Sequence, residues 1–459
     1  MPFTTRLQCP LLFISDMGPR KNEKLLREQG LSGNPYRFLF GEVKEMAQMG
    51  SKAKAKPIPF TNDIIPRVMP FILKTINTYG KRSFIWAGPR PTLLVMDPEL
   101  IREVLSKSYV YQKIPVHAMG KLLAFGLASQ DTQKWSKHRR LLSSAFHLEK
   151  LKLMVPAFDL KLSPWRDHVN WMCDLIFKLL LDGRKIFELQ QELVKLIVEF
   201  SRSIYIPGVR YLPTKRIRKI KALARKVQSS VLNIINKRVK AMQAGEPSAD
   251  DLLGILLESN FKEIQAHGSK KFGMSFKEVI EECKLFYFAG QETTAVLLIF
   301  GNNNPDIEGL NRVKVVTMIL NEILRLNPLG VMHSRIVHGE TKLAELLYRL
   351  KQLFLLSILL HLDEQIWGAD GKEFNPERCN DEVANATKGQ HVFVPFGSGP
   401  RVCISQNFAM LEAKMALSMI LQHFSFELSP SYAHAPHTVI ILQPQYGAQL
   451  IVRKVQCQN

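Results

Sequence analysis

The segment 396–403, FGSGPRVC, constrains the fold most, because it places a tight turn directly before a helix. Its two glycines permit unusual φ angles, and its proline stiffens the chain and removes a backbone donor. Apolar residues then recur at three- and four-residue steps, which predicts a helix over 406–423. The turn therefore brings Cys403 to a helix N-terminus, where the helix dipole and the free N–H groups favour a thiolate.

A lone cysteine is most often a small buried apolar side chain. For Cys403, the glycine turn, the preceding Arg401 and the following helix favour a metal ligand instead. A thiolate is the ligand that lets haem iron push electron density into bound dioxygen and cleave its O–O bond. The other cysteines form no CxxC pair, so zinc-site spacing is absent, and no disulfide framework is expected, which indicates a reducing compartment. They are Cys9, Cys173, Cys283, Cys379 and Cys457.

The apolar pattern of the 459-residue chain predicts a mainly α protein with small β-sheets near its two ends (α+β). Strand character lies at about 84–96 and again after 423, whereas most of 130–300 and 309–326 is typical of helices. A helix is also expected from residue 98, with Asp97 as its N-cap. The candidate site residues span 135–403 and must meet at one place, so 20–459 is interpreted as a single domain. Residues 1–19 form an atypical start without a membrane anchor, which would need about 20 apolar residues.

The charge balance is strongly basic, with 62 Lys and Arg against 41 Asp and Glu. Nucleic acid, an anionic membrane or an acidic protein would each suit a net charge of +21. The densest stretch, KRIRKIKALARK at 215–226, is either a solvated helix face or a surface that faces a membrane or a partner. No nucleic-acid partner is expected, because the basic residues lack an interleaved aromatic platform or a recognisable module.

With its cysteine loop, the chain resembles the cytochrome P-450 superfamily, in which this loop reads F-x-x-G-x-R-x-C-x-G. NEILRL supplies Glu322 and Arg325, the family's E-x-x-R pair, which share one helix face at this spacing. The resemblance implies that Arg378, in FNPERC, completes a structural triad that holds the cysteine loop. Such a triad is costly to break when it is buried, because each lost partner leaves an uncompensated charge.

The segment FAGQETT, 288–294, matches the family's distal helix motif. A glycine and two threonines are unfavourable inside a helix, and a threonine side chain can bond the carbonyl one turn back. The resemblance implies that Thr293 hydrogen-bonds the bound oxygen and that Glu292 relays protons. Without the rest of the pattern, the same residues would read as a plain core helix.

Further matches lie where the family binds its haem. The resemblance implies that haem b has Cys403 as the axial ligand of its iron. Its two propionates need several cationic donors. The matching residues come from WSKHR, HSRIVH and the cysteine loop; they are Trp135, Arg139, Arg335, Phe396 and Arg401.

The closer resemblance is to the plant branch that includes secologanin synthase, through stretches such as KHRRLLSSAFHLEKLK and ATKGQHVFVPFGSGPRVC. It implies a monooxygenase of plant secondary metabolism on the cytosolic face of the endoplasmic reticulum membrane. It also implies a hydrophobic, terpenoid-type substrate and electrons from NADPH through a flavoprotein reductase. The basic charge balance would suit docking to an acidic reductase surface.

The chain departs from the family pattern at several points. AVLLIF, which ends at Phe300, runs straight into GNNNPD, so a connecting helix is missing, and 164–183 and 343–352 are also altered. Ser405 stands where the family has glycine, and Cys379 replaces an aromatic residue. Skipped exons or a faulty gene model would produce such losses. The alternative function is therefore a truncated, inactive relative that binds haem weakly or acts only through protein contacts.

Overall fold

The computed structural model of the chain describes residues 17–38, 40–116, 119–123, 125–130, 132–153, 184–202, 214–245, 252–268, 273–302, 313–337, 341–343, 346–348, 353–380, 383–387 and 389–455. The predicted loss at 164–183 lies outside these residues, as does most of the junction that follows Phe300. In the altered segment 343–352, the described residues belong to a hairpin of β5 (Thr341–Leu343) and β6 (Leu346–Tyr348).

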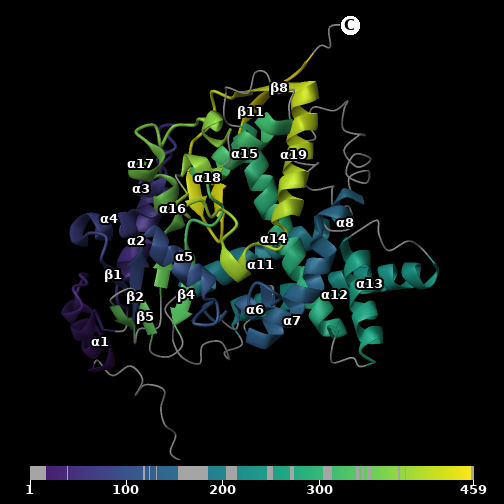
Figure 1. Cartoon of the computed structure of the whole chain (residues 1–459), viewed down its shortest axis with the longest axis horizontal. Coiled ribbons are helices and arrows are strands. Elements are labelled where there is room, and N and C mark those ends of the chain that lie inside the picture. The colour runs from purple at the N-terminus through teal and green to yellow at the C-terminus, as the bar shows by residue number, and fades with distance from the viewer. Residues whose placement is uncertain are drawn as a thin grey trace, which may run out of the picture.

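Helices make up most of the described chain (Figure 1). Their bounds are α1 (Met17–Glu28), α2 (Val43–Lys54), α3 (Ile65–Val68), α4 (Pro70–Tyr79), α5 (Pro98–Ser106), α6 (Gly120–Leu123), α7 (Thr132–Ser143), α8 (Leu148–Leu153), α11 (Arg184–Arg202), α12 (Lys215–Gln243), α13 (Leu252–Ala266), α14 (Phe276–Asn302), α15 (Val313–Leu326), α16 (Ser357–His361), α17 (Glu364–Trp367), α18 (Val383–Ala386) and α19 (Gln406–His423). Short 3-10 helices cover Ser144–Phe146, Pro376–Cys379 and Gly399–Arg401.

The remaining strands are short. They are β1 (Phe84–Ala87), β2 (Arg90–Val95), β3 (Tyr111–Gln112), β4 (His333–Val337), β7 (Leu353–Leu355), β8 (Phe424–Leu428), β9 (Pro436–Thr438), β10 (Leu442–Pro444) and β11 (Leu450–Lys454). The prediction of a mainly α protein with small sheets is confirmed.

A five-stranded sheet with the order β1-β2-β7-β4-β3 joins two distant parts of the chain. β2 pairs with β1 in antiparallel and with β7 in parallel orientation, so that Leu93 lies opposite Leu353. Successive side chains of a strand point to opposite faces of a sheet. Accordingly, Leu93 and Leu353 belong to one buried cluster, whereas their neighbours Leu94 and Phe354 belong to another. The middle strands β4 and β7 were not predicted from the sequence.

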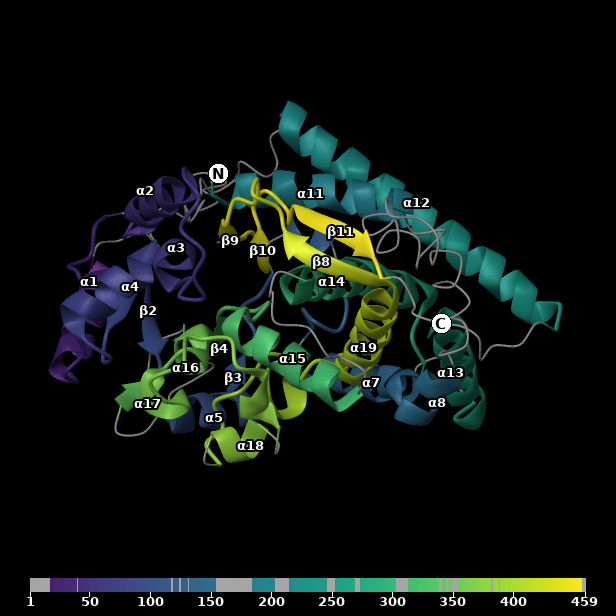
Figure 2. The ribbon, with the colours of Figure 1, turned by 90° about the horizontal axis from the view of Figure 1, so that it is seen from above.

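The helix α14 occupies the centre of the helical part, in contact with α11, α12, α15 and α19 (Figure 2). The long helix α12 lies along the outside. It begins after Thr214, whose Oγ1 accepts a hydrogen bond of 3.2 Å from the Ile217 N–H, which is the usual geometry of an N-cap. Its apolar residues recur on one side and are buried, whereas most of its Lys and Arg residues are exposed.

Among the helices of the described residues, none is both long and apolar enough to cross a bilayer.

Candidate functional site

The cysteine loop is a closed turn held by its own backbone. The Cys403 N–H donates a hydrogen bond of 2.9 Å to the Phe396 carbonyl, which brings the two ends of the loop together. Gly397 and Gly399 adopt φ angles of 74° and 68°, which glycine reaches without steric cost. A Cβ on Gly399 would lie only 2.4 Å from the carbonyl oxygen of Leu105. Glycine at this position therefore lets the loop lie directly against the end of α5.

The side chain of Cys403 is half-buried just before α19, where Ser405 occupies the N-cap position. Ser405 has a φ of −97°, a value that any L-residue adopts, so its Cβ causes no backbone strain. Its hydroxyl oxygen lies 3.4 Å from Cys403 Sγ, at hydrogen-bonding distance for sulfur. The thiol thus sits at the positive end of a helix dipole, as the sequence predicted.

Helix α7 meets the cysteine loop through two arginines. Arg139 Nη1 donates a hydrogen bond of 2.7 Å to the Val402 carbonyl, directly beside Cys403. Burial lowers the pKa of Arg139, and the nearby Cys403 opposes this shift. From the loop side, the guanidinium carbon of Arg401 lies 4.1 Å from the ring centroid of Trp135 in a cation–π contact. The structure therefore brings together four residues that the sequence singled out from segments far apart.

A buried glutamate on α14, which the sequence analysis did not identify, stabilises this arrangement. Glu282 on α14 is fully buried, and its Oε1 lies 2.6 Å from Nδ1 of the equally buried His138 on α7. Its Oε2 accepts a hydrogen bond of 2.9 Å from the Leu127 N–H. A Cβ on Gly126 would lie 2.5 Å from the same oxygen, so glycine leaves room there for the Glu282 carboxylate. Glu282 thus ties α7 and the loop at 125–130 to the central helix.

That loop also reaches the cysteine loop, because Arg401 Nη1 donates a hydrogen bond of 2.6 Å to the Gln130 carbonyl. Glu282 therefore acts on both arginines indirectly. It anchors the helix that carries Arg139 and the loop whose carbonyl accepts the hydrogen bond from Arg401. The histidine in WSKHR was the one local signal of this contact. Its acidic partner lies 144 residues further along the chain.

The segment 288–294, which matches the family's distal helix motif, lies in the middle of α14. Thr293 Oγ1 donates a hydrogen bond of 2.7 Å to the Ala289 carbonyl one turn back, which is the contact expected of a threonine inside a helix. Ala289 and Gly290 are exposed although α14 is flanked by other helices, and a Cβ on Gly290 would meet no atom within 4 Å. Open space therefore borders this turn. Glu292 belongs to α14, but its side chain lies outside the described residues.

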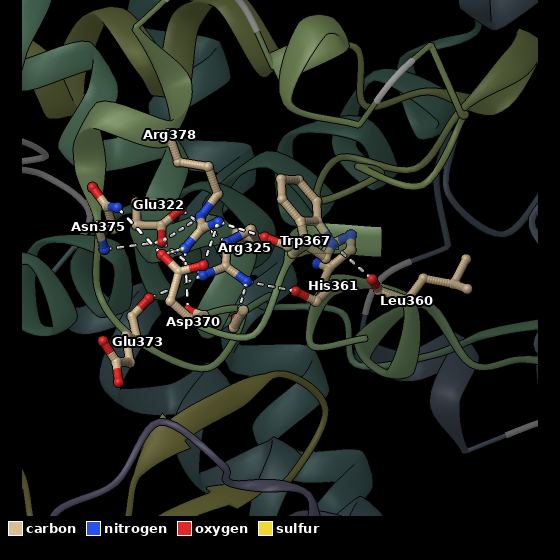
Figure 3. A network of polar contacts seen from close by, with 10 residues as sticks. Glu322, Arg325, Leu360, His361, Trp367, Asp370, Glu373, Asn375 and Arg378 are labelled. Carbon is tan, nitrogen blue, oxygen red and sulfur yellow. Dashed lines mark hydrogen bonds and ion pairs between the residues drawn. The ribbon is translucent and has the colours of Figure 1, made fainter. Parts of the chain in front are cut away.

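The glutamate–arginine pair lies at the C-terminal end of α15 in a polar network (Figure 3). Both side chains are fully buried, with Arg325 Nη2 at 2.6 Å and Nε at 2.8 Å from the Glu322 carboxylate oxygens. Arg378 approaches this carboxylate to 3.6 Å through Nε but bonds mainly to Asp370, at 2.7 Å. The three residues therefore meet, and Asp370 is a fourth member that the sequence analysis did not identify.

This network also reaches the backbone that leads to the cysteine loop. Arg325 Nη1 donates hydrogen bonds to the carbonyls of His361 and Gly371. His361 is fully buried, and its Nε2 lies 3.1 Å from the backbone N of Val394, two residues before the loop. The ring nitrogen is the acceptor here, because the amide can only donate. Burial, with the Arg325 charge as a lesser cause, lowers the pKa of His361 to about 3.

The remaining one of the five predicted haem-binding residues, Arg335, lies on β4 and is 6% exposed. Its Nη1 donates a hydrogen bond of 2.9 Å to the Ser334 carbonyl. β4 borders the cysteine loop, since a Cβ on Gly397 would lie 3.8 Å from Cε1 of His333. Burial lowers the pKa of His333 to about 4, and the charge of Arg335 contributes.

The donor set suits a cofactor with a metal ion and acidic groups. A half-buried thiol supplies a soft ligand, and Arg139 and Arg401 supply cationic donors on the same side. Ile404, next to the thiol, packs in one apolar cluster with Phe286 of α14. The cysteine loop therefore lies near the central helix that borders the open space. In the described residues no cluster of three His, Cys, Asp or Glu side chains could hold a bare metal ion.

Comparisons with known proteins agree with this geometry. A sequence model described as "Cytochrome P450" (cytochrome P-450) matches residues 69–163, 167–301 and 296–452. A cytochrome P-450 of Panax ginseng is 50% identical over 486 residues, covering 95% of this chain and 94% of that protein. Secologanin synthase 1 of Catharanthus roseus is 47% identical over 491 residues, with 95% and 93% covered. The 7-deoxyloganic acid hydroxylase of the same plant is 45% identical over 490 residues, with 95% and 94% covered.

The family match is interrupted at 164–166 and starts anew at 296, overlapping the preceding segment up to 301, and both places are where the sequence departs from the family pattern. The alignments are also longer than the 459 residues of the chain, so the relatives contain residues that have no counterpart here. The match nevertheless extends over most of the chain and includes every candidate site residue. The chain therefore belongs to the cytochrome P-450 family.

Proposed function

We propose that this cytochrome P-450 monooxygenase inserts one atom of dioxygen into a hydrophobic, terpenoid-type substrate and uses electrons from NADPH delivered by a flavoprotein reductase. Haem monooxygenase activity follows from the family. The observation that carries the proposal is the thiol of Cys403, held at a helix N-terminus in a loop that Arg139 contacts through the Val402 carbonyl and that itself contributes Arg401. The names of relatives from Catharanthus roseus, a secologanin synthase and a 7-deoxyloganic acid hydroxylase, support the substrate class.

In this proposal haem b supplies the iron chemistry that activates dioxygen, and the protein binds and orients it. Cys403 would supply the thiolate ligand of its iron. Arg139, Arg335 and Arg401 would hold the propionates, which accept charge-assisted hydrogen bonds. Trp135 fixes the Arg401 guanidinium through its ring, and Phe396 closes the cysteine loop through its carbonyl.

Thr293 and Glu292 of α14 would handle the protons that the reaction consumes. The Thr293 hydroxyl already engages a carbonyl of α14 next to open space, so it can exchange this bond for one to a bound ligand. Glu292 precedes it on the same turn and is proposed to relay protons from solvent. Proton transfer by a positioned side chain lowers a barrier only if the donor lies within hydrogen-bonding reach.

The positive charge of helix α12 suits contact with an acidic partner or an anionic membrane surface. It carries ten Lys and Arg residues and no Asp or Glu. Lys219 and Arg216 face Glu192 and Glu199 of α11, at 2.6 and 3.8 Å, while most of the other cations are exposed. Such a field speeds the encounter with an acidic surface. We place the protein at the cytosolic face of the endoplasmic reticulum membrane, where a reductase can reach it.

The decisive experiment is the spectrum of the purified, reduced protein with carbon monoxide. A red-shifted Soret band, typical of a thiolate ligand, is expected for the wild type, and its loss is expected for Cys403→Ala. A histidine-type band, or protein without haem, would overturn the proposal.

Substrate-dependent NADPH consumption with a plant reductase then tests turnover. A thiolate band without such consumption would favour the truncated, inactive relative, for which the breaks in the family match are the motivating observation. Product that carries one labelled oxygen atom from dioxygen would exclude it.

A further inference from the structure

We infer that the Ser405 hydroxyl donates a hydrogen bond to the Cys403 thiolate and thereby makes the haem iron of this protein easier to reduce. This inference rests on the proposed role of Cys403 as the axial ligand. Ser405 is therefore a positioning and tuning residue rather than a catalytic one.

The geometry places the two side chains in direct contact. Ser405 Oγ lies 3.4 Å from Cys403 Sγ, within the range of a hydrogen bond to sulfur. Both side chains are partly buried. The two residues are separated in the sequence by Ile404 alone. Ile404 packs into an apolar cluster with Phe286 and Phe408.

The backbone fixes the serine in this position. The Ser405 carbonyl accepts a hydrogen bond of 2.8 Å from the Ala409 N–H, so the residue is the N-cap of α19. An N-cap serine usually turns its hydroxyl to a free N–H of the first helical turn. Ser405 makes no such side-chain cap, and its hydroxyl contacts the sulfur of Cys403. The hydroxyl is therefore directed to the thiol instead of to the helix.

Metal binding decides which atom donates. Either atom could be the donor when the cysteine is a thiol. A coordinating thiol is deprotonated, so the thiolate has lone pairs and no proton. The hydroxyl carries the one proton that these two side chains can then share, and Ser405 becomes the donor.

Hydrogen bonds to a ligating sulfur are among the factors that set the reduction potential of an iron site. A donor draws electron density away from the thiolate, which stabilises the ferrous state, because the electron-rich iron receives less density from its ligand. The serine therefore raises the reduction potential. It also weakens the push of electron density toward a ligand on the opposite side of the iron.

The test compares holoprotein with serine, alanine, glycine and threonine at position 405. Ser405→Ala removes the hydroxyl and keeps the Cβ, Ser405→Gly removes both, and Ser405→Thr keeps the hydroxyl. Purified proteins are titrated with reductant while the haem spectrum is recorded. At a fixed potential, we expect a ferrous-to-ferric ratio about tenfold lower for Ala and Gly, which is about 59 mV for a one-electron couple. The threonine variant is expected to stay close to the wild type.

The carbon monoxide complex gives a second measurement that does not depend on turnover. Stronger donation from the sulfur lowers the C–O stretching frequency, because more density reaches the bound ligand. The frequency should fall for Ala and Gly and remain for Thr. An unchanged potential and frequency in the alanine variant would overturn the inference.

A shift seen only with glycine would overturn it as well, because the cause would then be the missing Cβ. The two proposals fail separately. If the wild type lacks a thiolate-type spectrum, the role of Cys403 is wrong. If all four proteins have that spectrum and equal potentials, the role of Cys403 stands and that of Ser405 is wrong.

Discussion

The Arg401 guanidinium lies over the Trp135 ring, with its carbon 4.1 Å from the ring centroid, while Nη1 donates to the Gln130 carbonyl. An indole ring is the best partner for a cation–π contact, and the carbonyl fixes the direction of the guanidinium. Arg139 is held in the same way by the Val402 carbonyl. The protein thus orients both arginines through its own atoms, which reduces the entropy that propionate binding would otherwise cost.

Replacement of Trp135 tests this orientation. Trp135→Leu removes the ring, whose contact with a cation is worth about 1–2 kcal/mol at a partly desolvated site. Because 1.4 kcal/mol corresponds to a factor of ten, we expect haem release about tenfold faster than in the wild type. Trp135→Phe keeps a weaker ring and should fall between the two. Transfer of haem to apomyoglobin measures the rate, and equal rates in all three proteins would contradict the orienting role.

Replacement of Glu282 tests whether this residue stabilises the position of α7. Glu282→Gln removes the carboxylate that faces the buried His138 and accepts a hydrogen bond from the Leu127 N–H, and a buried polar group left unsatisfied costs about 1–3 kcal/mol. We expect a drop of this size in the free energy of unfolding, together with faster haem release.

The matched control is Glu263→Gln, which breaks the exposed pair of 2.5 Å between Arg140 on α7 and α13. Exposed pairs contribute about 0–1 kcal/mol, so this variant should unfold like the wild type. Chemical denaturation gives both numbers. Equal losses in the two variants would show that Glu282 has no special role.

The buried pair on α15 gives a similar contrast. Glu322→Gln leaves Arg325 without its charge partner in a fully buried position, and we expect a loss of about 3–5 kcal/mol and little haem-loaded protein. Asp370→Asn removes the other acid that pairs with Arg378, but Asp370 is 45% exposed. Its loss should cost about 1 kcal/mol or less. Yield of holoprotein and thermal unfolding measure both, and a larger effect of Asp370→Asn would reverse the assignment.

The lowered pKa of His361 predicts that the stability of the folded protein depends on pH. Its pKa is about 3 in the folded protein and 6.5 in an unfolded chain. Between these values the unfolded chain binds a proton that the folded protein does not, so the free energy of unfolding falls as the pH falls. The slope from this group is about 1.4 kcal/mol per pH unit. Above pH 6.5 its contribution is constant.

The measurement is the free energy of unfolding at several pH values between 6.5 and 4. His361→Gln should reduce the slope by about one proton relative to the wild type. The control is His147→Gln, because His147 is exposed. An unchanged slope in His361→Gln would show that this histidine is not held neutral.

Thr293 is predicted to hydrogen-bond the bound oxygen. Thr293→Val removes the hydroxyl with little change in shape, whereas Thr293→Ser keeps it. With a proton donor missing, reduced oxygen should leave as hydrogen peroxide, so product per NADPH should fall by about 100-fold or more, the lower end of what a positioned proton donor contributes. Peroxide and product are measured together. Equal coupling in the valine and serine variants would exclude a role for the hydroxyl.

Local elements could be predicted from the sequence because their signals are local. Asp97 caps α5 as expected, with its side chain accepting a hydrogen bond of 2.9 Å from the Leu100 N–H. The helix after the cysteine loop has the predicted bounds, Gln406–His423. A cap and a periodic apolar face depend only on residues within a few turns.

Contacts between distant segments could not be predicted in the same way. β4 and β7 have only five and three residues, too few for a clear alternation, and each also pairs with a strand from much earlier in the chain, β3 and β2 respectively. Glu282 and Asp370 carry no motif, and their importance follows only from which side chains the fold places beside them. The resemblance to the family supplied the residues of the site, whereas these supporting residues required the structure.

The parallel pairing of β2 with β7 has a consequence for synthesis of the protein. Leu93 is synthesised 260 residues before Leu353, so this part of the sheet cannot form until Leu353 has been translated. At a translation rate of about 5–20 residues per second, the delay is roughly 13–52 seconds. During that time the apolar edge of β2 has no native partner on the ribosome. An unpaired strand edge is a template for pairing with another chain, so this edge is open to aggregation until β7 has been synthesised.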